Sequence, residues 1–416
     1  MDKGLLFRPV VAYALHKEIF WGWRTVFSVF SLRRGAFVVV GVCAAVLALQ
    51  APSGATVVSS APLASPAPAF NLRVRSIVHS GSVIYVGGDF TNVTVDSIKY
   101  PRNHVAAIDP ETGALLPWNP NTNGDVYTLA VDRGGVYLGG AFSSVGGVAV
   151  KNLARVNGTT GALDRRVHHK FNNIVRTVSL SSNRVYVGGD FTQLGTSTRL
   201  HLAAFQRFSP FRLTGWAPRA AHGVVNVVKV TRRAVYVGGA FSKLNGQSAY
   251  RFLARVDRSS GALSGSFKTS SRYPVFGVAL TPYRVYAAAG GPGGHVYAKR
   301  RSTGHGIWHR TFDGDVQAVA VLDGTVYVGG HFEHVCSTDR TGPYGHCLDA
   351  GAAYRMKLAA FGTMGGLSTW DPHADSGVGV TTLDPFPGRS WLAVGGTFDT
   401  LDNGTVTAHK FAVFAH

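Results

Sequence analysis

Carboxylate and histidine side chains recur at one place in a repeated motif, Val-Tyr-Val-Gly-Gly-x-Phe, whose position x varies. The residues at x are Asp89, Ala141, Asp190, Ala240, His331 and Thr397. Because the motif tolerates alanine at x, its polar versions are candidates for a functional site. Carboxylates gathered at one place can bind a cation or orient sugar hydroxyls, and a pair held about 5 to 9 Å apart can cleave a glycosidic bond.

A second set of polar residues lies where the valine-rich segment of a repeat begins. Asp125 and Asp315 follow a glycine there, and His222 and Asp375 lie close to the equivalent place in other repeats. Each of these side chains could instead satisfy a nearby backbone N–H at a turn. The candidate ligand-binding residues are therefore Asp89, Asp125, Asp190, His222, Asp315, His331 and Asp375.

Nitrogen, oxygen and sulfur donors also lie close together in sequence, in His331, Glu333, His334, Cys336 and Cys347. Such a set suits zinc. An oxidising compartment instead favours a disulfide between the two cysteines, and this bond would consume both thiolates. We expect the disulfide, stabilising its short loop by about 2 to 3 kcal/mol, and neither a metal nor another cofactor.

Standard catalytic motifs are absent from the sequence. It contains no Gly-x-Ser-x-Gly elbow, no Cys-x-x-Cys pair and no His-Glu-x-x-His. Serine hydrolase, thiol redox and zinc protease chemistry therefore lack support, and whether the chain is an enzyme stays open.

The elements that position these residues come from the repeat. The motif occurs in six good copies and one degenerate copy, Val285-Tyr-Ala-Ala-Ala289, at a spacing of roughly fifty residues, which is typical of propeller blades and solenoids. Each period contains four short apolar segments separated by turn residues. The sequence therefore predicts an all-β, seven-bladed β-propeller of four-stranded antiparallel blades.

The motif glycines and aromatics are explained by packing. Glycine ends the second strand where a neighbouring blade approaches closely, and the following phenylalanine can wedge between blades. The last copy stops at residues 410–414 without a fourth strand. We expect the segment ahead of the first copy to supply the outer strand of the last blade.

The N-terminus predicts export. Residues 35–50 form an uncharged apolar run, preceded by Arg33 and Arg34 and followed by small residues, in the order of a signal or anchor helix. We expect residues 1–55 to be a leader and signal or anchor segment, residues 56–69 a linker with a closing strand, and residues 70–416 the propeller. The predicted location is extracellular, with membrane attachment only through an uncleaved N-terminal segment.

The chain is strongly basic, with a formal charge of +19. Residues 1–55 hold six Lys/Arg and two Asp/Glu, so the remainder still carries +15. Such a surface attracts polyanions over roughly a Debye length. A polysaccharide or cell-wall polymer is the expected partner of a monomer, without specific nucleic-acid recognition.

With these residues in view, the chain resembles secreted bacterial β-propellers with delta-60-type repeats, over about residues 70–416. The segment from Ala107 to Gly113, followed by Trp118, is also similar to the tryptophan-docking motif of quinoprotein dehydrogenases. The resemblance implies the fold and an extracellular location, and it implies little chemistry.

Three functions follow, in order of preference. The first is an extracellular binding or scaffold module that recognises a glycan or an anionic cell-surface polymer. The alternative is a carbohydrate-active enzyme, a polysaccharide lyase or glycoside hydrolase, acting at the mouth of the propeller's central channel. The third is a quinoprotein-like oxidoreductase.

Overall fold

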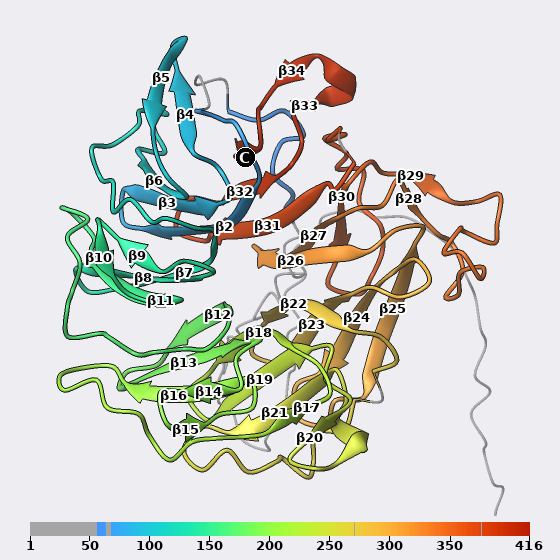
Figure 1. Ribbon diagram of the computed structural model, residues 1–416. Helices are drawn as coiled ribbons and strands as arrows, with labels where there is room; N and C mark the ends of the chain where they lie inside the picture. The colour runs from blue at the N-terminus through green and yellow to red at the C-terminus, as the bar shows by residue number, and fades with distance from the viewer. Residues whose placement is uncertain (1–55, 64–67, 270, 376) are drawn as a thin grey trace, which may run out of the picture. The chain divides into compact units, whose positions relative to one another are not determined.

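The computed structural model describes residues 56–63, 68–269, 271–375 and 377–416 (Figure 1). The predicted leader and signal segment, residues 1–55, lies outside the described residues. The described part is all-β, apart from two single helical turns, η1 (Ser248–Tyr250) and η2 (Asp402–Gly404). Within it, no helix has the length and apolar character needed to cross a membrane.

Each of the seven motif copies forms the second strand of its own antiparallel sheet, and we number these repeat sheets 1 to 7 in chain order. Their first strands are β2 (Val74–Ser80), β7 (Val126–Asp132), β12 (Val175–Leu180), β18 (Val225–Val230), β22 (Val275–Leu280), β26 (Val316–Leu322) and β31 (Val380–Phe386). Their second strands are β3 (Val83–Gly88), β8 (Gly135–Gly140), β13 (Arg184–Gly189), β19 (Ala234–Gly239), β23 (Arg284–Ala289), β27 (Thr325–Gly330) and β32 (Trp391–Gly396). Their third strands are β6 (Val105–Ile108), β11 (Leu153–Asn157), β16 (Leu202–Gln206), β21 (Leu253–Asp257), β24 (Gly294–Arg300), β30 (Leu358–Gly362) and β35 (Phe411–Phe414).

The fourth segment of a repeat is shorter than expected. Only sheet 5 has a regular fourth strand among the described residues, β25 (Gly306–Phe312). In sheet 1 the fourth segment makes one bridge, between Ile108 and Leu115, through bonds from the Leu116 N–H to the Ala107 carbonyl and from the Asp109 N–H to the Ala114 carbonyl. Pro117 follows, and because proline has no N–H the pairing cannot continue.

Short strands lie beside the repeat sheets. They are β1 (Ala69–Phe70), β4 (Asn92–Val95), β5 (Ile98–Pro101), β9 (Ser144–Val145), β10 (Val148–Ala149), β14 (Gln193–Leu194), β15 (Ser197–Thr198), β17 (Ala220–Ala221), β20 (Lys243–Leu244), β28 (His334–Val335), β29 (Ala353–Tyr354), β33 (Thr400–Leu401) and β34 (Val406–Thr407). Two of them, β28 and β29, continue sheet 5 beyond its fourth strand. Most of these short strands follow the motif phenylalanine of their repeat.

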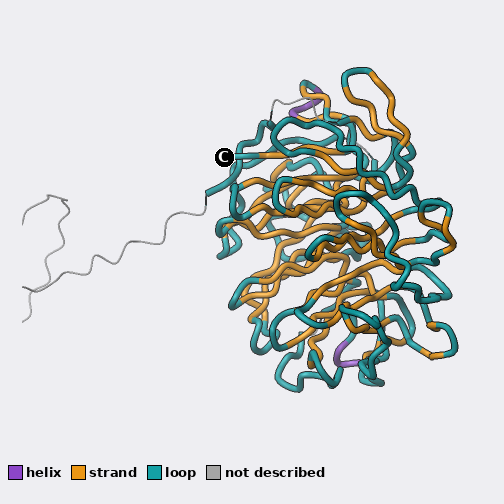
Figure 2. The backbone as a smooth tube through the Cα atoms, turned by 90° about the vertical axis from the view of Figure 1, so that its left-hand side faces the viewer, coloured by secondary structure: helices purple, strands orange, loops and turns teal. Residues whose placement is uncertain are grey.

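The first strand of each repeat sheet packs beside the first strand of the next. The last of them, β31, packs beside β2, so the blue and red ends of the chain meet in Figure 1. Figure 2 shows the strands inside the body and the loops around its edges. The core consists of apolar clusters between neighbouring sheets, such as the one that joins Val126 and Leu129 to Tyr85 and Val105.

Close approach explains both motif glycines. A Cβ on Gly188 would lie 2.5 Å from Val225 of the next sheet, and one on Gly189 would lie 2.1 Å from the carbonyl oxygen of Ile174. Both distances are far below van der Waals contact, so a side chain at either place in sheet 3 would force its neighbours to move. Sheet 5 has Ala288 and Ala289 at the equivalent places, and there Gly277 lies opposite Ala288 where sheet 3 has Thr177. The packing role expected for these glycines therefore has a steric basis.

The motif tyrosine connects neighbouring sheets. In sheet 1 the Tyr85 hydroxyl donates to the Gly158 carbonyl of sheet 2 at 2.8 Å, and the Trp118 indole donates to the Asn157 carbonyl at 2.9 Å. The two rings meet edge to face, with centroids 5.0 Å apart. The tyrosine–tryptophan pair thus holds the outer turn of the following repeat.

Residues 56–63 contact the tyrosine–tryptophan pair of sheet 6 in the way that the outer turn of sheet 2 contacts the pair of sheet 1. They also run along β35. The Val58 N–H donates to the Tyr327 hydroxyl at 2.8 Å, and the Trp370 indole donates to the Ser59 carbonyl at 3.0 Å. The Ser59 and Leu63 N–H groups donate to the carbonyls of Ala415 and Val413. The segment therefore joins the last repeat sheet from the outside.

Candidate functional site

Every first strand contains a β-bulge at its second residue, where the register with the second strand shifts. A bulge leaves one residue outside the ladder and redirects its side chain. The bulge residues, in chain order of the sheets, are Arg75, Tyr127, Arg176, Asn226, Phe276, Gln317 and Thr381. One side chain per repeat is thereby removed from strand pairing.

These seven side chains line one cavity of about 370 Å³, together with Arg73 and Asp315. We call this cavity the mouth. Its volume lies within the range of about 300 to 1,000 Å³ that small-molecule sites occupy. Aromatic rings, amides and guanidinium groups contributed by all seven repeats therefore converge on one hollow.

The mouth contains a cluster in which Tyr127 lies beside two arginines, Arg75 and Arg176. The Arg75 guanidinium carbon lies 4.3 Å from the centre of the Tyr127 ring, and that of Arg176 lies 5.6 Å from it. Both distances are within the range of cation–π attraction. The three side chains therefore form one cluster that is rich in hydrogen-bond donors.

Each of these arginines forms an ion pair with the aspartate at position x of its own motif. Asp89 accepts hydrogen bonds from the Arg75 Nε and, at 3.0 Å, from its Nη2; it also accepts one from the Arg73 Nε at 3.1 Å. Asp190 accepts from the Arg176 Nε and, at 2.8 Å, from its Nη2. The Nη1 groups of Arg75 and Arg176 have no hydrogen-bond partner among the described residues, so each keeps donors for a ligand.

Each aspartate holds the guanidinium group of its arginine in place and leaves the Nη1 donors of that group unpaired among the described residues. Hydrogen bonding to Asp190 raises the pKa of Arg176, which therefore stays charged. The sequence-predicted Asp89 and Asp190 thus position arginines and do not themselves line the mouth.

Asp125 and Asp315 precede first strands, and both are less acidic than an ordinary exposed carboxyl. Burial raises the pKa of Asp125, with a smaller contribution from Asp89, although His104 lies 3.6 Å from its carboxylate. Burial also raises the pKa of Asp315, opposed by a hydrogen bond from the Gly291 N–H. Asp315 is the one sequence-predicted residue among the mouth-lining residues.

The remaining candidates lie elsewhere. Asp375 accepts hydrogen bonds from the N–H groups of Asp399 and Thr400, at 2.7 and 2.9 Å. Asn123 and Asn172 accept the equivalent pair of hydrogen bonds in sheets 2 and 3. We call a residue at this position a loop clamp, because its side chain binds two successive backbone N–H groups of a neighbouring loop. His222 and His331 are exposed and do not line the mouth.

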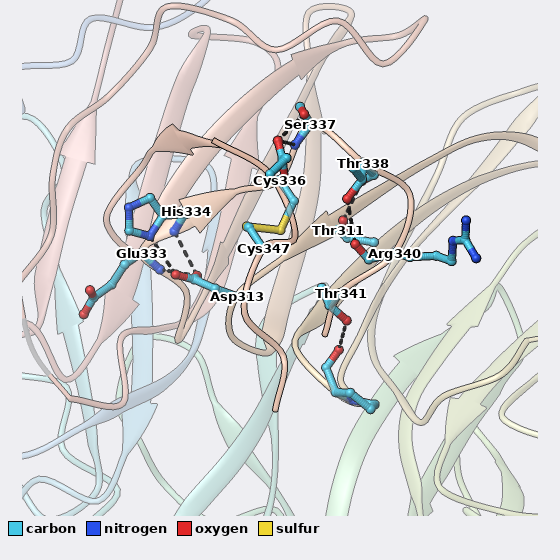
Figure 3. The surroundings of a disulfide bond; sticks show 12 residues. Thr311, Asp313, Glu333, His334, Cys336, Ser337, Thr338, Arg340, Thr341 and Cys347 are labelled. Carbon is cyan, nitrogen blue, oxygen red and sulfur yellow. Dashed lines mark hydrogen bonds and ion pairs between the residues drawn. A yellow bond between two sulfur atoms is a disulfide. The ribbon is translucent and has the colours of Figure 1, made fainter. Parts of the chain in front are cut away.

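Cys336 and Cys347 form the expected disulfide (Figure 3). Beside it, the Asp313 carboxylate accepts from the N–H groups of Glu333 and His334, and His334 Nδ1 lies 2.7 Å from the same carboxylate. These donors are therefore engaged in protein contacts. Among the described residues no group of three or more His, Cys, Asp or Glu side chains could hold a metal ion.

The bulge residues are the part of the site that sequence reasoning missed. Their signal was present: one residue after the first valine of each repeat interrupts the alternation of a strand, and it is polar or aromatic in all seven copies. Because strict alternation along a strand does not reveal a bulge, these residues were not among the candidates.

Comparison with solved structures shows a β-propeller fold. The WD40 propeller domain of Doa1 matches with a TM-score of 0.54 at 12% identity, covering 87% of this chain and 97% of that one. The WD40 repeats of RRP9 match with a TM-score of 0.57 at 10% identity, covering 86% and 99%. The computationally designed Ika8 protein matches with a TM-score of 0.51 at 11% identity, covering 88% and 100%. No protein-family model and no curated protein matches the sequence. At such low identity the likeness is one of fold alone, so this chain is an all-β protein of the β-propeller kind.

Proposed function

We propose that the protein is an exported, seven-bladed propeller of the delta-60 type that binds a carboxylate-bearing glycan at its mouth. The observation that carries this proposal is the Arg75–Tyr127–Arg176 group, in which both guanidinium groups are held by aspartates and keep outward donors. The adjacency of first strands, from β2 round to β31, supports the blade number.

The chemistry of the mouth suits an acidic sugar. Guanidinium groups recognise carboxylates through paired N–H donors. Tyr127 and Phe276 offer flat apolar faces, while Asn226 and Gln317 offer amides for hydroxyl groups. A uronic acid presents all three features: a carboxylate, an apolar ring face and hydroxyls.

Titration calorimetry with galacturonic acid, and with glucose as the neutral counterpart, tests this function. Arg176→Ala should weaken galacturonate binding at least about tenfold, equivalent to about 1.4 kcal/mol. Arg233→Ala removes an exposed arginine at the other end of β18 and should leave the affinity unchanged. Equal binding of glucose and galacturonate, or equal loss in both variants, would contradict the proposal.

One observation favours the enzymatic alternative. Asp315 lines the mouth, and burial raises its pKa, which is the direction of shift found in general acids. The test is to incubate acidic and neutral polysaccharides with the protein and assay for new reducing ends and unsaturated products. Activity that disappears in Asp315→Asn would support a hydrolase or lyase; inactivity across the panel would exclude it for those substrates.

A further inference from the structure

A groove lies between sheets 2 and 3. It has a volume of about 600 Å³, and it continues into a second hollow of about 300 Å³ that shares Ser143, Lys151 and Asn172 with it. The second hollow extends to Ile174, two residues before Arg176. We call the two hollows together the side groove.

Two lysines line the side groove from its opposite walls. Lys151 precedes the third strand of sheet 2, and Lys170 lies in the link that leads into sheet 3. Both are exposed, and neither has an ion pair among the described residues. No carboxylate is among the residues that line either hollow.

The repeat supplies a direct comparison for this pair. In the gap between sheets 1 and 2 the equivalent positions are Asn103 and Asn121, as the backbone bonds show: Gly146 N–H to Asn121 carbonyl matches Gly195 N–H to Lys170 carbonyl. There the Asn103 amide donates to the Asn121 side-chain oxygen at 2.8 Å. The fold therefore accommodates, at this place, two polar side chains that hydrogen-bond to each other.

The lysine pair replaces that hydrogen bond with two like charges. In the next gap, between sheets 3 and 4, the equivalent residues are Leu200 and Arg219, which form no such pair of charges. Like charges facing one gap without a counter-charge raise the local potential and attract anions. Of these three gaps, the side groove alone has paired cations.

The position of alanine at x adds to the argument. Ala141 lines the inner hollow, where the neighbouring repeats have Asp89 and Asp190. An aspartate here would fill part of the inner hollow and would place a negative charge beside Lys151. Alanine leaves the hollow open and without a negative charge.

We propose that the side groove binds the continuing chain of the acidic glycan whose end sugar occupies the mouth. This inference rests on the proposed function and names its ligand more closely, as an oligomer of carboxylate-bearing sugars. Lys151 and Lys170 pair with carboxylates of successive sugars, and Asn172 and Ser143 border the path. The apolar floor, Val150 and Phe171, is buried, and the exposed ring in the lining is the imidazole of His168.

The experiment compares galacturonic acid with its hexamer at low ionic strength. The wild-type protein should bind the hexamer at least about tenfold more tightly than the monomer, because the groove contacts add to the mouth contacts. Lys151→Asn/Lys170→Asn, which installs the pair found in the neighbouring gap, should remove this advantage and leave monomer binding unchanged. The control Arg232→Asn/Arg233→Asn lowers the net charge equally and should retain the advantage.

The outcomes separate the two proposals. An undiminished hexamer advantage in the lysine variant, an equal loss in the arginine control, or stronger binding of a single-stranded oligonucleotide than of the hexamer would overturn the side-groove proposal. Loss of both monomer and hexamer in Arg176→Ala supports the mouth. Hexamer binding that needs the lysines but is unaffected in Arg176→Ala would instead keep the groove and refute the mouth.

Discussion

Arg176 and Arg75 show how a repeated frame creates a site from single substitutions. Both arginines lie at bulges, and each is oriented by the aspartate at position x of its own repeat, 14 residues further along the chain. Where x is alanine, as at Ala141, the bulge residue is Tyr127 and needs no counter-charge. The identity of x is therefore coupled to the identity of the bulge residue.

This coupling predicts the behaviour of the x position. Asp190→Asn removes the charge that orients Arg176 and should weaken binding of the acidic sugar at least about tenfold, since a charged hydrogen bond contributes roughly 1.5 to 3 kcal/mol when intact. Calorimetry on Asp190→Asn beside His331→Asn checks this. Because His331 is exposed and lies outside the mouth, its variant should bind normally. Unchanged binding in the Asp190 variant would refute the coupling.

How far the residues could be predicted depends on their environment. The variable x position was recognised because alanine alternates with aspartate there, but its role as an arginine partner was not. Asp375 was grouped with Asp125, whereas its bonds to Asp399 and Thr400 place it with the loop clamps. The link before sheet 7 is longer than in other repeats, so counting from the first strand misplaced it.

At the scale of elements, the motif glycines allow neighbouring strands to approach closely. Gly188→Ala would place a methyl group 2.5 Å from Val225, and overpacking of this kind costs about 1 to 3 kcal/mol. Gly215→Ala meets no atom within 4 Å and should be neutral or slightly stabilising. Urea denaturation of both variants checks the difference. Equal stability of the two proteins would contradict the close-approach account.

The long strands of sheet 5 carry a buried histidine pair that should affect stability at low pH. His295 Nδ1 lies 3.1 Å from His309 Nε2, and burial lowers the pKa of each to about 4. The unfolded value is about 6.5, so below that pH the unfolded chain binds more protons than the folded one. The free energy of unfolding should therefore fall as the pH is lowered from about 6.5 to about 4.

Urea titrations across this interval, on the wild-type protein and His309→Phe, measure the effect. The phenylalanine keeps the stacking on Tyr297 but does not titrate, so its free energy of unfolding should fall less steeply. His416→Gln, at the exposed C-terminus, should behave as wild type. A wild-type slope in His309→Phe would show that the pair does not control the pH dependence.

The fold was the most predictable element of the account, because the glycine pairs and valine-rich strands repeat with little change. The all-β propeller fold expected from the motif is confirmed by the WD40 neighbours. Four full strands per repeat were not found, since prolines such as Pro117 end the outer pairing early. Regular alternation predicts paired strands well, whereas bulges and short outer segments depend on contacts that a single repeat does not show.

At the scale of the molecule, residues 56–63 join the two ends of the described chain. They take the place that the outer turn of the next repeat takes elsewhere, through Tyr327 and Trp370. Trp370→Phe removes one such hydrogen bond and should lower stability by about 1 kcal/mol. Hydrogen exchange should also accelerate at the Ser59 and Leu63 amides, while Trp391→Phe leaves them protected. Unchanged exchange in both variants would contradict this role.

The basic charge acts over the whole surface, whereas the mouth and side groove concentrate it at one place. Long-range attraction to a polyanion weakens as salt is added, because exposed charges are screened beyond roughly 8 Å at physiological ionic strength. Contacts in the mouth are partly buried and are screened less. Binding of an acidic oligomer should therefore weaken with salt while its selectivity over a neutral oligomer persists.

A crystal structure of the protein with a galacturonic acid oligomer tests the central claim most directly. The account predicts the end sugar in the mouth, its carboxylate on the free Nη1 donors of Arg75 and Arg176 and its ring face against Tyr127 or Phe276. An oligomer bound on another surface, with the mouth filled only by water, would contradict it.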